Sequence, residues 1–110
     1  MYRRGAVWTT ELPGIGRKPA VILSDHAVTL ALRPIVARIT SVERPRAVPT
    51  AVALGPGEVD GLPEHSYVLC HDLVTVQTDG LIEHMGTVPR ERMIEIEDRL
   101  AFVFGVGHWS

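Results

Sequence analysis

Two adjacent cations, Arg17 and Lys18, are the residues whose types and position most directly suggest chemistry. They follow the turn-forming sequence PGIG at residues 13–16 and come just before the apolar run Ala20–Leu23, and Lys18 is the only lysine of the chain. Arginine presents a planar fork of donors that fits two phosphate oxygens, whereas lysine is a compact point charge. A pair of cations at the start of a buried strand can therefore bind an anionic group and stabilise negative charge on it. If the strand has already begun at Arg17, the two side chains point to opposite faces and only one of them serves the site.

The charges of the chain are unevenly distributed, although the net charge is only −2. Residues 1–46 carry eight basic and three acidic residues, a net charge of +5, whereas residues 47–110 carry three basic and ten acidic residues, a net charge of −7. This asymmetry favours an anionic partner for the first half, where Arg38, Arg44 and Arg46 follow the cation pair. The alternative, that these arginines are scattered solvated side chains, stays open at this level.

Two hydroxyls and one histidine are further candidates for polar chemistry. Thr40 and Ser41 end the apolar segment that begins at Ile35, where they can contact a substrate or simply satisfy the backbone of a turn. His71 follows Cys70, and an imidazole can shuttle protons near neutral pH. The spacing of the cysteine and the histidines fits no common zinc signature, so we expect no metal. The sequence PGIGRK precedes a strand and lacks the Gly-Lys-Ser/Thr ending of a phosphate loop, so we expect no nucleotide cofactor.

The elements that must position these residues are mostly short strands. Apolar and β-branched segments separated by Gly, Pro and a His-Asp pair predict about six strands, at residues 5–10, 20–23, 35–40, 50–54, 66–70 and 73–77. The segment HAVTLAL allows one helical turn before the third strand. We therefore expect a mainly β chain whose strongly bent sheet or small barrel forms a single domain over residues 1–110.

The C-terminal segment has a different period. Met93, Ile96, Leu100 and Val103 recur at spacings of three and four residues, with charged residues between them, which predicts an amphipathic helix over residues 89–104. Thr87 is expected to cap its start and Gly105 to mark its end. The helix is expected to pack against the sheet.

The cysteine content and hydropathy bear on the compartment. A single cysteine excludes an internal disulfide, and no apolar run approaches the length of about 20 residues that is needed to cross a bilayer. Since residues 1–5 lack a long apolar segment, we also expect no signal peptide. We expect a cytoplasmic protein that does not enter a membrane.

The order of several segments resembles one known family. The segments RRGAVW, GRKPAVILS, PIVARITS, LPEHSYVLCHDLVTV and GTVPRERMIEIEDRL together resemble the MazF/PemK endoribonucleases of toxin-antitoxin systems, over roughly residues 3–104. The resemblance implies a small SH3-like β-barrel with a C-terminal helix, a homodimer, and a cognate antitoxin that silences it. It also implies sequence-selective cleavage of single-stranded RNA without a metal, by attack of the ribose 2′-hydroxyl on the neighbouring phosphorus.

The resemblance also implies a catalytic pair. Its positions, an arginine just before the proline of the second strand and a threonine at the end of the third, are held here by Lys18 and Thr40, and Arg17 can compensate for the change to lysine. RNA is then expected to contact Arg38, Ser41, Arg44, Arg46 and His71. In some relatives an acid lies near the cysteine of the fifth strand. Here the acid is missing or displaced to Asp72.

Two other functions stay open because Lys18 departs from the family pattern. One is a non-enzymatic toxin similar to CcdB, which binds a protein target such as DNA gyrase. The other is a catalytically degenerate decoy that only binds the antitoxin. Cleavage of RNA by the purified protein distinguishes both from the endoribonuclease.

Overall fold

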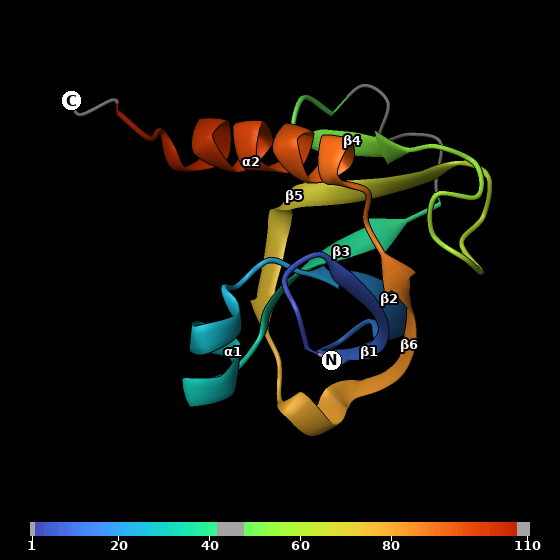
Figure 1. Ribbon diagram of the computed structural model, residues 1–110, viewed down its shortest axis with the longest axis vertical. Coiled ribbons are helices and arrows are strands. Elements are labelled where there is room, and N and C mark those ends of the chain that lie inside the picture. Colours follow the sequence, from blue (N-terminus) through green and yellow to red (C-terminus); the bar gives the residue numbers. More distant parts are fainter. Residues whose placement is uncertain (1, 42–47, 108–110) are drawn as a thin grey trace.

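The computed structural model describes residues 2–41 and 48–107 of the chain. Its elements, in chain order, are β1 (Ala6–Leu12), β2 (Gly16–Ile22), α1 (His26–Ala31), β3 (Ile35–Thr40), β4 (Ala51–Leu54), β5 (Ser66–Thr75), the 3-10 helix η2 (Thr78–Gly80), β6 (Leu81–Thr87) and α2 (Arg90–Phe104). The strands form an antiparallel sheet in the order β4-β5-β3-β2-β1-β6. Figure 1 shows that the sheet curves into a barrel-like shape. The outer strands β4 and β6 do not pair with each other, so the sheet is not closed.

A hydrophobic core lies on each face of the central strands. Ala20 and Ile22 belong to one apolar core, and Val21, which lies between them in β2, belongs to the other. The core that contains Val21 also receives Met93 and Ile96 from α2, which lies over β4 and β5 (Figure 1). Because successive side chains of a strand point to opposite faces, a strand with a core on each side must be apolar throughout. This confirms the prediction of a mainly β fold with a packed C-terminal helix.

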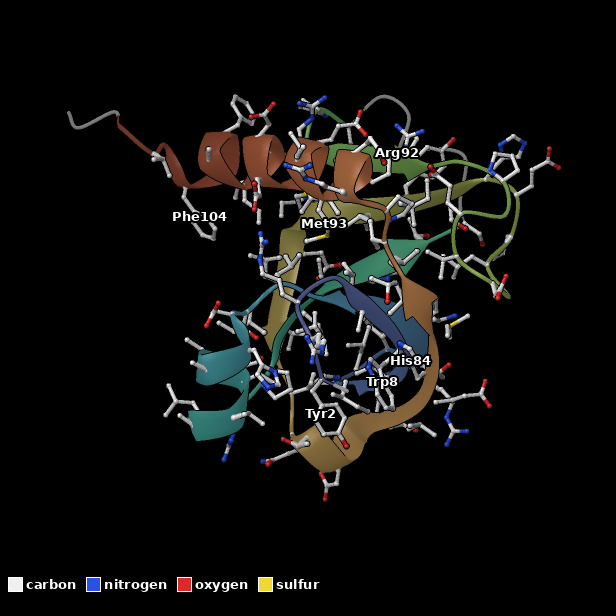
Figure 2. All side chains as sticks on the ribbon, viewed as in Figure 1. Tyr2, Trp8, His84, Arg92, Met93 and Phe104 are labelled. Atoms are coloured by element: carbon white, nitrogen blue, oxygen red, sulfur yellow. The ribbon has the colours of Figure 1, made fainter. Side chains whose placement is uncertain are left out.

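A group of three ring side chains lies at β1 and β6, on the side of the sheet away from β4. Trp8 lies between Tyr2 and His84, with ring centroids 5.2 Å apart in both pairs and tilted planes (Figure 2). Contacts between tilted rings stabilise a fold by more than the burial of their apolar surface alone. They tie the N-terminal segment and β6 to β1.

Two strands were predicted where the structure has one, and one strand of the structure was not predicted, so the total of six is unchanged. Residues 66–70 and 73–77 were expected as separate strands, but β5 is continuous from Ser66 to Thr75. The His-Asp pair lies at an irregularity in its pairing with β3, where Ala37 faces Leu73 but Ile39 faces Val68. This is a bulge in one strand and not a turn between two. Figure 1 shows the sharp bend of β5.

The strand β6 was not predicted. In its sequence LIEHMGT only Leu81 is buried, and the other side chains are exposed or half-buried. It is an edge strand held by its backbone pairing with β1, which contains two register shifts. Hydrophobic pattern detects such strands poorly because little of their side-chain surface is buried.

The first helix and the end of the second were predicted correctly, whereas the residue that caps the start of the second was not. The helical turn after Asp25 is confirmed as α1, and the Asp25 carboxylate accepts a hydrogen bond from the Ala27 amide at 3.1 Å. Gly105 ends α2 in the left-handed conformation, with φ 62°, as expected. Thr87 does not cap α2, because it is the last residue of β6, and the N-cap residue Pro89 has no capping side chain. None of the helices in the described part of the chain is long and apolar enough to cross a membrane.

Candidate active site

A cavity of about 300 Å³ lies where β2 begins and β3 ends. Lys18 and Pro19 line it from β2, and Arg38 and Thr40 line it from β3, with Ser41 just beyond. Its other wall includes residues 61–63 of the loop between β4 and β5. The cavity therefore combines two cations and the hydroxyls of Thr9, Thr40, Ser41 and Ser66 with an apolar wall.

The pairing of β2 with β3 brings the polar residues of the cavity together. Ala20 faces Arg38 in this antiparallel pair. This is the last recorded pair of the two strands, and alternation along each strand places Lys18 on the face of Ala20 and Thr40 on the face of Arg38. All three side chains belong to residues that line the cavity.

Arg17 lies apart from this group. Because β2 begins at Gly16 and not at Ala20, Arg17 and Lys18 are both strand residues and point to opposite faces. Arg17 faces Glu11 of β1, and its Nε is 3.6 Å from the Glu11 carboxylate. It is not among the residues that line the cavity. Only Lys18 of the cation pair shares the cavity with Thr40.

His71 also lies outside the cavity lining. It is exposed on β5, and its Nδ1 is 2.5 Å from the Thr50 hydroxyl. Asp72, the next residue, does not line the cavity either, but its Oδ2 lies 3.5 Å from Nη1 of Arg38, which does. The acid that the sequence suggested as displaced, Asp72, therefore contacts an arginine of the cavity lining, Arg38. Arg44 and Arg46 lie outside the described residues.

The loop that forms the wall is held at its base by α2. Arg92 donates from Nε to Oε1 of Glu58 at 3.0 Å and from Nη1 to Oε2 of Glu95 at 2.9 Å. The same Oε1 of Glu58 accepts a hydrogen bond from the amide of Gly55. Figure 2 shows Arg92 on the first turns of α2, beside this loop. The loop was not recognised as part of the site, because its contact with β2 and β3 comes from chain segments far apart in the sequence.

Glu58→Gln is expected to destabilise the protein by about 1 kcal/mol at neutral pH and to lose that difference in acid. The amide of Gly55, and then Arg92, lower the pKa of Glu58 below its ordinary value of 4.5. The contribution of the carboxylate is therefore fully present above that value and disappears as the pH falls through the lowered pKa of the folded state. Urea unfolding at pH 7 and at about pH 3 measures the two midpoints.

Glu64→Gln is the control, since Glu64 is an exposed carboxylate of the same loop. Its midpoint should stay close to that of the wild type at both pH values. A gap between Glu58→Gln and wild type that stays constant down to about pH 3 would contradict the role given to the Glu58 charge.

Cys70 is a core residue and not a reactive thiol. Its side chain is fully buried, and burial raises the pKa of the thiol to about 11. Because the thiolate is the reactive form, the folded protein should not react with Ellman's reagent at pH 8, whereas the urea-unfolded chain should release one equivalent of thionitrobenzoate. Rapid reaction of the folded protein would contradict this assignment. Within residues 2–41 and 48–107, no three His, Cys, Asp or Glu side chains gather in a way that could hold a metal ion.

The chain is similar to a family of bacterial toxins. Residues 3–104 match the family described as PemK-like, MazF-like toxin of type II toxin-antitoxin system. The probable endoribonuclease MazF5 of Mycobacterium tuberculosis (strain ATCC 25618 / H37Rv) is 36% identical over 91 residues, which cover 82% of this chain and 81% of that protein.

Solved structures agree with this relationship. An endoribonuclease from a mycobacterial species, in complex with its cognate antitoxin, is 32% identical with a TM-score of 0.82, and the likeness covers 98% of each chain. A MazE-MazF structure from Deinococcus radiodurans has a TM-score of 0.76 at 22% identity over 94% of each chain, which supports the fold alone. Because the family match spans nearly all of the sequence, the chain belongs to the PemK-like, MazF-like toxins of type II toxin-antitoxin systems.

Proposed function

We propose that this protein is the toxin of a type II toxin-antitoxin system and cleaves single-stranded RNA without a metal ion. The ribose 2′-hydroxyl attacks the neighbouring phosphorus, so a bond forms from the 2′-oxygen to phosphorus and the bond from phosphorus to the 5′-oxygen breaks. The 2′-proton leaves to a base, and the 5′-oxygen takes up a proton. The products are a cyclic phosphate and a 5′-hydroxyl end.

One observation carries this proposal: Lys18 and Thr40 line the same cavity, in a chain that belongs to the toxin family. The ammonium group of Lys18 stabilises the negative charge that grows on the phosphoryl oxygens, where a fixed charge acts most strongly on the transition state. The hydroxyl of Thr40 hydrogen-bonds to the reacting ribose or phosphate. Arg38 and Ser41 add contacts to the RNA backbone, and Arg44 and Arg46 extend the basic segment.

The partners follow from the same relationship. We propose a homodimer in the cytoplasm whose activity is silenced by a cognate antitoxin. The similar mycobacterial endoribonuclease is found in complex with its own antitoxin. The bases of single-stranded RNA can turn outward and enter a small groove, whereas the bases of a duplex are stacked and paired. Single-stranded RNA is therefore the substrate that fits this site better.

Incubating the purified protein with total RNA in excess EDTA, and mapping the new ends, tests the proposal. Discrete cuts with 5′-hydroxyl ends are expected, with the same pattern when magnesium is present. The absence of cuts would overturn the enzymatic function. Growth arrest that depends on DNA gyrase, without RNA cleavage, would then support the CcdB-like alternative.

A further inference from the structure

We propose that Arg38 binds the phosphate at the cleaved bond and that Asp72 is the residue that positions it. This inference rests on the proposed RNA cleavage and extends it, because it assigns the site a second cation and the acid that orients it. Asp72 was not among the residues expected to contact RNA, and Arg38 was expected only as one of several backbone contacts.

The first support is the place of Arg38 in the sheet. Arg38 and Thr40 are two residues apart on one face of β3, and the β2–β3 register sets Lys18 on the same face. All three line the cavity. Lys18 contributes a point charge, and Arg38 contributes a planar fork that can hold two oxygens of one phosphate.

The second support is the unused hydrogen-bonding capacity of the guanidinium. A guanidinium has five N–H donors. The Oδ2 of Asp72, at 3.5 Å from Nη1, lies at the outer limit of a hydrogen bond, so the carboxylate orients the group without occupying its donors. Nε of Arg38 is buried and has no hydrogen-bond partner among the described residues. A ligand oxygen cannot reach this buried atom without a change of conformation, so a phosphate is held by the other donors of the side chain, which is 30% exposed.

The third support is the place of Asp72 beside the bulge of β5. Ala37 faces Leu73, so Arg38 and Asp72 are the next residues in that register, immediately before the pairing shifts. In β5 the residues between Val68 and Leu73 face only the short stretch of β3 between Ile39 and Ala37. Bulges often lie next to active sites, where they redirect a side chain. The Arg38–Asp72 pair is also a weak candidate for a purely stabilising ion pair, since the two side chains are 30% and 37% exposed. We therefore assign the Asp72 carboxylate the role of orienting the guanidinium of Arg38.

The test measures two quantities for each variant: the cleavage rate with RNA in EDTA, and the affinity for a fully 2′-O-methylated single-stranded RNA of mixed sequence, which cannot be cleaved. Arg38→Ala should lower cleavage about a hundredfold and weaken binding of the methylated RNA. Arg38→Lys keeps the charge without the fork and should recover most of the binding but little of the rate. Arg33→Ala, an exposed arginine outside the cavity, is the matched control and should change neither.

Asp72→Asn tests positioning. Losing the carboxylate should lower the cleavage rate about tenfold, while the affinity for methylated RNA rises because a negative charge leaves the site. A merely structural role would lower both quantities together. In the Arg38→Ala background, Asp72→Asn should have no further effect on the rate, because residues that act through one another are not additive.

The outcomes separate this inference from the proposed function. If the wild type cleaves RNA and the folded variants Arg38→Ala and Arg38→Lys cleave and bind as it does, the inference is overturned while the proposed function stands. If the wild type binds methylated RNA but cleaves none, the proposed function fails. The phosphate contact then stands only if Arg38→Ala weakens that binding. Thermal melting of each variant identifies a loss of fold, in which case Arg38→Lys decides.

Discussion

Lys18→Ala is expected to lower the rate of RNA cleavage by about a hundredfold to a thousandfold, the usual effect of removing one group that stabilises the charge of a transition state. Lys18 is exposed at the start of β2, and among the described residues no ion pair is recorded for it, so the melting temperature should change little. Initial rates on a fluorogenic RNA that contains the mapped site measure the change, and circular dichroism follows the fold.

Arg17→Ala is the matched comparison for this variant. It removes a cation from the adjacent position, but one that faces Glu11 on the other side of β2. Its cleavage rate should stay near that of the wild type. A large loss in Arg17→Ala together with a small loss in Lys18→Ala would show that the catalytic cation had been assigned to the wrong face of the strand.

Thr40→Val should lower the cleavage rate by about a hundredfold or more, because the variant keeps the shape of the side chain and removes its hydroxyl. A group that assists proton transfer or hydrogen-bonds to the reacting atoms commonly contributes that much. Thr40→Ser restores the hydroxyl and should recover much of the rate. We expect Thr40→Val to lower kcat more than it changes the KM for RNA. Single-turnover and steady-state kinetics measure the two effects separately.

The serine variant makes this prediction specific. If Thr40→Ser is as inactive as Thr40→Val while both fold, the methyl group and not the hydroxyl carries the role of Thr40. If Thr40→Val cleaves as well as the wild type, Thr40 only completes the end of β3, which is the simpler function of a hydroxyl at the end of a strand.

Parts of the site could be predicted from local sequence. The segment IVARIT is β-branched and alternating, and β3 has the predicted bounds of Ile35 and Thr40. The position of Lys18 beside Pro19 was recognised through the order of segments shared with a family. The bounds of β3 were predicted correctly because strand propensity and pattern depend on a few consecutive residues. The role of Lys18 stays a prediction.

Other parts could not be predicted locally. Whether Arg17 and Lys18 point to opposite faces depends on where β2 begins, and its pairing with β1 extends the strand back to Gly16 through residues with little β propensity of their own. Asp72 follows a histidine that suggested a turn, but cross-strand pairing keeps β5 continuous and places its bulge beside Arg38.

The sequence by itself determined the mainly β class, the C-terminal helix that Gly105 ends, and the basic character of the first half of the chain, because periodicity, turn residues and charge are local properties. Only the tertiary structure decided which residues share the cavity: Lys18 with Arg38 and Thr40, and not Arg17 or His71. The physical reason is that strand register and bulges are set by pairing between distant segments, and a shift of one residue turns every side chain to the other face.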